Sequence, residues 1–203
     1  MDGQVGTERG WATWPNAVTA VRLALLPVYV YLVLATDHWA VAAWLLATLG
    51  ATDWVDGFLA RRWHQVSSVG KILDPVADRL LVMTGVLTIA LVGAVPWWFA
   101  GLTLAREIVV SLVTLLLASL GAARIDVLWW GKVSTFALMM AYPLFLLTTN
   151  PHDVARSAWQ VAIRDLTWAI GGFGLVLAWI VLAGYVSPAL EALRSGRAAR
   201  RVH

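Results

Sequence analysis

Long runs of apolar residues, separated by short polar segments, repeat along the 203-residue chain. Most runs hold about 20 residues, the length that an α-helix needs to cross the ~30 Å hydrocarbon core of a bilayer. The second run is apolar for only about 13 residues, so its helix must continue through a charged segment to span that thickness. The pattern predicts six membrane-spanning helices, at residues 14–35, 39–62, 70–92, 97–120, 129–149 and 166–186.

The composition agrees with an all-α integral membrane protein. Hydrophobic residues make up 60% of the chain and charged residues only 13%, which excludes an ordinary soluble domain. The absence of cysteine excludes a disulfide scaffold, a thiol nucleophile and a thiolate metal site. No internal repeat or second domain is visible, so we expect one membrane domain over residues 1–203, with a flexible lead-in at residues 1–13 and a basic tail at residues 188–203.

The basic residues predict the orientation of this domain. The net charge is +3, and the cations lie at the ends of apolar runs and in the tail, as for contact with anionic lipid headgroups rather than nucleic acid. Six spans place both termini on one side, which the positive-inside rule assigns to the cytoplasm of a bacterial cell. The cations expected there are Arg9, Arg61, Arg62, Arg124 and the arginines of the tail, against Arg156 and Arg164 on the opposite side.

Residues 51–81 place four aspartates in this apolar protein. An aspartate at the centre of a membrane helix costs roughly 2.5 to 3.5 kcal/mol, so the four require compensation. Asp53 and Asp56 are three residues apart, and Asp74 and Asp78 are four apart, so each pair shares one helix face. Four carboxylates suit Mg²⁺ or Mn²⁺ far better than zinc. The pattern therefore predicts two helices that face a common polar cavity near the cytoplasmic surface.

The spacing of the fixed residues in this segment resembles that of a known protein family. The pattern D-x-x-D-G-x-x-A-R, eight residues, then G-x-x-x-D-x-x-x-D resembles the signature of the CDP-alcohol phosphotransferase family at every fixed position. Buried ion pairs that only hold a helix bundle together would leave the glycine and alanine positions without a purpose. The eight fixed positions are Asp53, Asp56, Gly57, Ala60, Arg61, Gly70, Asp74 and Asp78.

The resemblance implies a reaction in which an alcohol hydroxyl attacks the lipid-linked phosphorus of CDP-diacylglycerol and expels CMP. It implies two Mg²⁺ or Mn²⁺ ions bound by the four aspartates, with Asp78 also acting as general base. It further implies a homodimer among membrane lipids. The residues that it assigns to CDP binding are Asp53, Asp56, Gly57, Ala60, Arg61 and Gly70.

Other blocks resemble the bacterial phosphatidylglycerophosphate synthases of this family. The first, P-N-x-x-T-x-x-R, places Asn16, Thr19 and Arg22 every three residues, where they line a possible edge of the site. The blocks A-R-E-I and G-K follow later, and in them we expect Arg106 and Glu107 to point at different partners. The resemblance implies glycerol 3-phosphate as the acceptor, with its phosphate bound by Arg106, Arg124 and Lys132.

Two departures keep other acceptors open. Thr114 and Ser134 stand where that branch carries cations. Their loss fits a less charged acceptor, such as phosphatidylglycerol in cardiolipin synthases, and inositol phosphate or another alcohol is a further alternative. An ion-coupled transporter is the alternative from another class, but it would spread acidic residues along a path across the membrane, whereas here they cluster at one surface.

Overall fold

The computed structural model describes residues 14–63, 70–119, 129–151 and 155–184, with side chains described for 17–52, 76–115, 129–151 and 155–184. These residues form six α-helices and no strand. The predicted lead-in and basic tail lie outside the described residues. The helices are α1 (Trp14–Leu34), α2 (Trp39–Trp63), α3 (Gly70–Leu91), α4 (Trp97–Ser119), α5 (Trp129–Leu147) and α6 (Ala158–Gly184).

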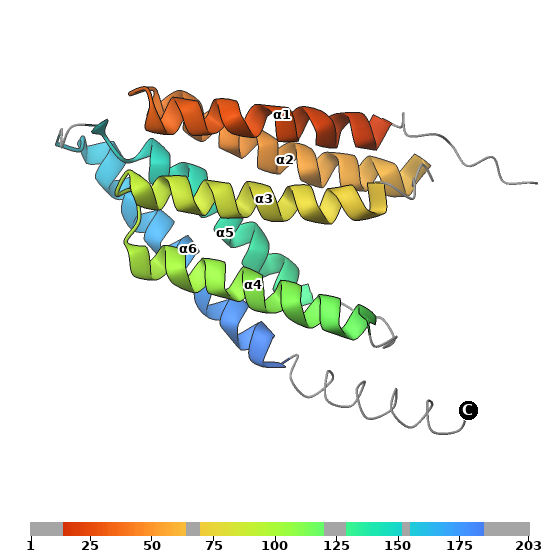
Figure 1. Cartoon of the computed structure of the whole chain (residues 1–203). Coiled ribbons are helices and arrows are strands. Elements are labelled where there is room, and N and C mark those ends of the chain that lie inside the picture. The colour runs from red at the N-terminus through yellow and green to blue at the C-terminus, as the bar shows by residue number, and fades with distance from the viewer. Residues whose placement is uncertain (1–13, 64–69, 120–128, 152–154, 185–203) are drawn as a thin grey trace, which may run out of the picture.

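The helices alternate in direction, so that α1, α3 and α5 begin at the end of the molecule where α2, α4 and α6 finish (Figure 1). Helix α1 packs against α2 and α3, and α2 packs against α5. Helix α5 has its most extensive contact with α6, while α4 lies beside α3 and α6. We call the end where α1 begins the site end, because the charged segment of α2 and α3 lies there.

Close packing of α5 against α6 depends on glycine. A Cβ atom on Gly174 would lie 3.0 Å from the Ala137 Cβ and 3.2 Å from the Ser134 carbonyl oxygen. Small residues let the backbones of membrane helices approach in this way. Between α1 and α3, the Tyr29 hydroxyl forms a buried 2.8 Å hydrogen bond with Thr88 Oγ1, which fixes the first helix to the third.

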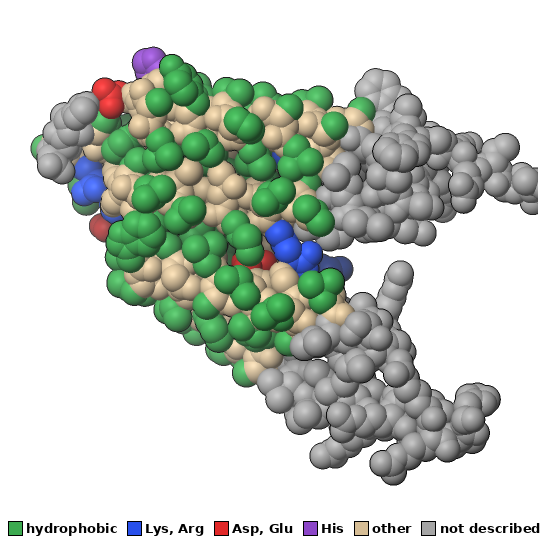
Figure 2. Space-filling model, viewed as in Figure 1, with side chains coloured by type: hydrophobic (Ala, Val, Ile, Leu, Met, Phe, Trp, Pro, Cys, Tyr) green, Lys and Arg blue, Asp and Glu red, His purple; other side chains and the backbone are tan. Residues whose placement is uncertain are grey.

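The outer surface of the bundle is mainly apolar, as Figure 2 shows for one face. Large hydrophobic side chains that are exposed in the isolated chain occur on all six helices. Within the part of the chain that the structure describes, four helices are long and apolar enough to cross a membrane: α1, α4, α5 and α6. The apolar part of α2, Trp39–Thr52, is shorter, as the sequence predicts. The prediction of an all-helical membrane protein is confirmed at this level, while six spans and a polar cavity stay predictions.

The predicted helix limits agree with the structure for α1 to α5, but the prediction for α6 was wrong at its start. Helix α6 begins at Ala158, eight residues before the expected start at residue 166. The sequence Ser157-Ala-Trp-Gln160 forms a capping box, in which the Ser157 N–H donates to Gln160 Oε1 at 2.9 Å. This cap starts the helix although Arg164 and Asp165 make its first turns polar.

Candidate active site

The eight positions of the aspartate motif lie on two helices. Helix α2 continues through Asp53, Asp56, Gly57, Ala60 and Arg61, which confirms the prediction that this helix extends beyond its apolar part. Helix α3 begins at the motif glycine, Gly70, and carries Asp74 and Asp78. Among the motif side chains, that of Asp78 belongs to the described residues, and the other seven lie outside them.

Asp78 forms an ion pair with Arg22 on α1. Arg22 Nη1 donates to Asp78 Oδ1 at 3.1 Å. The Arg22 side chain is 1% exposed, whereas the Asp78 side chain is 44% exposed. A buried guanidinium requires a counter-charge, and at 44% exposure the Asp78 side chain can still be reached by another molecule. The structure thus brings together two residues that are 56 positions apart and that the sequence assigns to the site.

The rest of the predicted α1 edge is only partly described. Thr19 is buried at 2% exposure, one turn before Arg22 on α1. Asn16 belongs to α1, but its side chain lies outside the described residues.

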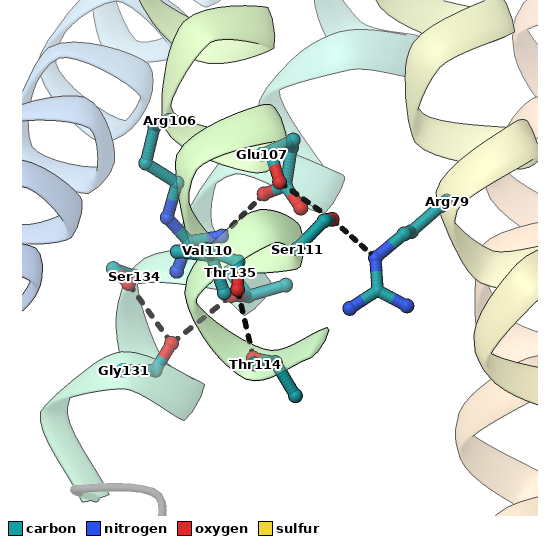
Figure 3. A network of polar contacts seen from close by, with 9 residues as sticks. All are labelled: Arg79, Arg106, Glu107, Val110, Ser111, Thr114, Gly131, Ser134 and Thr135. Carbon is teal, nitrogen blue, oxygen red and sulfur yellow. Dashed lines mark hydrogen bonds and ion pairs between the residues drawn. The ribbon is translucent and has the colours of Figure 1, made fainter. Parts of the chain in front are cut away.

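A second polar group joins α3 to α4 near the same end, and Figure 3 shows its members. Arg79, the residue after Asp78, donates from Nε to Ser111 Oγ at 2.5 Å. The Ser111 hydroxyl donates to the backbone carbonyl of Glu107 at 2.7 Å. Through these two bonds, the helix that carries Asp78 is connected to the helix that carries Arg106.

Arg106 Nη1 forms an ion pair with Glu107 Oε1. The expectation that these neighbours point at different partners was therefore wrong. Side chains at adjacent positions leave a helix about 100° apart, but a long arginine side chain can bend round the helix to reach a glutamate. Both side chains are largely buried, at 10% and 14% exposure, so each needs a nearby opposite charge.

Of the other two residues expected to bind the acceptor, the structure describes one. Lys132 is exposed near the start of α5, and Arg124 lies outside the described residues. Thr114 Oγ1 donates to the Val110 carbonyl at 2.7 Å, and Ser134 Oγ donates to the Gly131 carbonyl at 2.9 Å. Both hydroxyls thus bond within their own helices, where the related synthases would carry cations.

Sequence reasoning did not assign Arg79, Ser111 or Glu107 to the site. Two signals were available. Arg79 follows Asp78 directly, and Ser111 lies four residues after Glu107, where a serine hydroxyl can reach the carbonyl one turn back.

With this geometry in view, comparison with known proteins decides the family. The family model described as CDP-alcohol phosphatidyltransferase matches residues 12–186. The chain belongs to the CDP-alcohol phosphatidyltransferase family. This confirms the predicted family and the expected class of enzyme, a transferase of phospholipid biosynthesis.

Relatives within this family carry two different names. The Streptomyces coelicolor cardiolipin synthase (CMP-forming) is 34% identical over 195 residues, covering 92% of this chain and 87% of that protein. The CDP-diacylglycerol--glycerol-3-phosphate 3-phosphatidyltransferase of Bacillus subtilis is 30% identical, covering 89% and 97%. That of Pectobacterium atrosepticum is 36% identical, covering 73% and 84%. The first name states cardiolipin as the product, and the second states glycerol 3-phosphate as the acceptor, so the relatives' names support two different acceptors within one family.

Proposed function

We propose that this protein transfers the phosphatidyl group of CDP-diacylglycerol to an alcohol acceptor, with glycerol 3-phosphate as the first candidate, and releases CMP. The observation that carries the proposal is the complete aspartate motif on two neighbouring helices, with Asp78 paired to Arg22 and 44% exposed. Membership of the CDP-alcohol phosphatidyltransferase family and the names of several relatives support it.

In the proposed reaction, Asp78 accepts the proton of the acceptor hydroxyl. The hydroxyl oxygen then forms a bond to the lipid-linked phosphorus, and the bond from this phosphorus to the CMP oxygen breaks. The electron pair leaves with CMP, and the proton remains on Asp78 until water removes it. The ion pair with Arg22 fixes the direction of the carboxylate, because Arg22 itself is held inside the bundle at 1% exposure.

Asp53, Asp56, Asp74 and Asp78 would hold Mg²⁺ or Mn²⁺, for which a set of carboxylate oxygens is the appropriate donor set. Two bound ions would neutralise the charge that develops on the phosphoryl oxygens. The chain's own contribution to donor binding comes from the small residues of the motif. Gly57, Ala60 and Gly70 would leave room for cytidine and its phosphates, with Arg61 as their counter-charge on α2.

The phosphate of the acceptor needs cations of its own. Arg106 lies within the α3–α4 polar group, and Lys132 is exposed near the start of α5. With Arg124, these residues would bind the phosphate of glycerol 3-phosphate by charge-assisted hydrogen bonds.

Phosphatidylglycerol is the second candidate acceptor, and two observations favour it. Thr114 and Ser134 bond to carbonyls of their own helices, so two positions that would hold cations in the glycerol 3-phosphate enzymes are neutral. The Streptomyces coelicolor relative, which covers 92% of this chain, is named a cardiolipin synthase. A phosphodiester carries one charge fewer than a phosphate monoester, so it requires fewer cations.

The test is direct product analysis. Purified protein in detergent micelles receives radiolabelled CDP-diacylglycerol with Mg²⁺ or Mn²⁺ and either glycerol 3-phosphate or phosphatidylglycerol. Thin-layer separation should show phosphatidylglycerophosphate with the first acceptor. Cardiolipin as the sole product would replace the first candidate by the second, and absence of CMP release with either acceptor would refute the proposed function.

We further propose that all six helices span the membrane, that the charged ends of α2 and α3 face the cytoplasm, and that the enzyme works as a homodimer. Because the six helices alternate in direction, α1 begins and α6 finishes at the same end of the bundle (Figure 1), which supports one membrane side for both. The cations of the connecting segments and tail support the cytoplasmic side.

A further inference from the structure

Arg106 has an incomplete set of hydrogen bonds for a buried arginine. The residue is 9% exposed, and within the described part of the chain it donates only from Nη1, to Glu107 Oε1. Its Nε is buried and has no hydrogen-bond partner. Buried donors without a partner are uncommon in native proteins, and each one calls for an explanation.

The position of Glu107 determines which donors of Arg106 remain. A guanidinium group presents Nε–H and one Nη2 hydrogen along one edge, as two parallel donors. Because Glu107 takes Nη1, this Nε–Nη2 edge is left without a protein partner among the described residues. Two parallel N–H donors match two oxygens of a phosphate group.

Glu107 also takes part, through its backbone, in the contact between α4 and α3. Its carbonyl oxygen accepts the Ser111 hydroxyl, and Ser111 accepts a hydrogen bond from Arg79, which follows Asp78 on α3 (Figure 3). The residue that pairs with Arg106 therefore lies where α4 is joined to the helix of the candidate base.

We infer that Glu107 is a positioning residue, which orients Arg106 so that its Nε–Nη2 edge receives the phosphate of the acceptor. This inference rests on the proposed function and assigns a role to a residue for which the motif gives none. A phosphate monoester and a phosphodiester both offer two oxygens to such an edge, so the inference applies to glycerol 3-phosphate and to phosphatidylglycerol.

Kinetics of three variants test it. Glu107→Leu removes the bond to Arg106 and should raise the acceptor KM roughly tenfold or more, with less than about a threefold change in the KM of CDP-diacylglycerol. Glu107→Gln keeps an oxygen that accepts the same bond and should recover most of this loss. Arg164→Gln is the matched control, because Arg164 donates to the Ala94 carbonyl and to Thr149 Oγ1 at the opposite end of the bundle. It should leave the ratio of the two KM values unchanged.

Several kinetic results would overturn the inference. A lower acceptor KM in Glu107→Leu would mean that the carboxylate competes with the phosphate rather than orienting Arg106. Equal rises of both KM values, or the same change in Arg164→Gln, would mean a general structural effect.

A spectroscopic measurement keeps the inference separate from the proposed function. In protein labelled with ¹⁵N-arginine, the Nε–H resonance of Arg106 is the one that Arg106→Lys removes. Inorganic phosphate should shift this resonance in the wild type and in Glu107→Gln, but not in Glu107→Leu. If neither acceptor is turned over, the proposed function fails, while this shift still decides the role of Glu107. An unchanged resonance in the wild type would refute the inference.

Discussion

Replacing Arg22 with glutamine tests whether the pair with Asp78 serves the reaction. The substitution removes the 3.1 Å charge-assisted hydrogen bond to Asp78 Oδ1. Such bonds contribute about 1.5 to 3 kcal/mol, and we take the lower value because the Asp78 side chain is 44% exposed and water can replace part of the interaction. About 1.5 kcal/mol corresponds to a roughly tenfold lower kcat. The KM of CDP-diacylglycerol should change less than about threefold, because Arg22 pairs with the candidate base rather than with the donor.

The assay measures initial rates of CMP release in detergent micelles, with thermal unfolding of each variant recorded in the same detergent. Arg22→Gln leaves Asp78 partly solvated, so the unfolding midpoint should fall little. Asp78→Asn instead removes a carboxylate that pairs with the buried Arg22 charge and should destabilise the fold more. Arg164→Gln again serves as control, since it removes an arginine from the other end of the bundle. Full activity of Arg22→Gln, or an equal loss in Arg164→Gln, would refute the reasoning.

Four further predictions follow from the proposed site. Turnover should require Mg²⁺ or Mn²⁺, and full activity after dialysis against EDTA would contradict this. Asp78→Asn should abolish turnover but retain binding of CDP-diacylglycerol, because Asp78 is the proposed base. Asp53→Asn should lose metal-dependent binding of CMP, because Asp53 is proposed as a metal ligand. Equal loss of CMP binding in both variants would count against these separate roles. If glycerol 3-phosphate is the acceptor, Lys132→Gln or Arg106→Gln should raise its KM roughly tenfold and that of CDP-diacylglycerol much less, as substrate titrations would show. Light scattering in several mild detergents should give the mass of a dimer, and a monomer in all of them would oppose it.

The sequence predicts the helices well because their ends have local chemical causes. Tryptophan opens α1, α2, α4 and α5, and the second apolar run is too short to cross a bilayer without its charged extension. The start of α6 differs because the capping box at Ser157 begins the helix before its apolar run does. Arg164, two residues before the expected start of the sixth span, belongs to α6 and donates to the Ala94 carbonyl, 70 positions earlier in the chain. No local pattern indicates that contact.

The depth of each polar residue in the bundle is the part of the site that the sequence can specify, as the hydrogen-bonded pairs show. Arg22 lies eight residues after the start of α1, and Asp78 lies eight residues after the start of α3. Both are therefore about 12 Å from the same end of the bundle, at 1.5 Å per residue. Arg79 and Ser111 also lie at similar depths from this end, since Ser111 lies eight residues before the end of α4.

Depth in the bundle can thus be estimated from helix limits, and it restricts the possible partners of a charge in a membrane helix. Rotation of each helix about its axis cannot be estimated in this way, because it depends on how the apolar faces of all six helices pack. Glu107 illustrates both points. It lies twelve residues before the end of α4, about 18 Å deep, roughly 6 Å beyond Asp78. At that depth, a cation on a motif helix would have to extend along the bundle to reach it, whereas Arg106 is one residue away. The pairing of two adjacent charges follows from this depth, and it leaves the Nε–Nη2 edge of Arg106 for a phosphate.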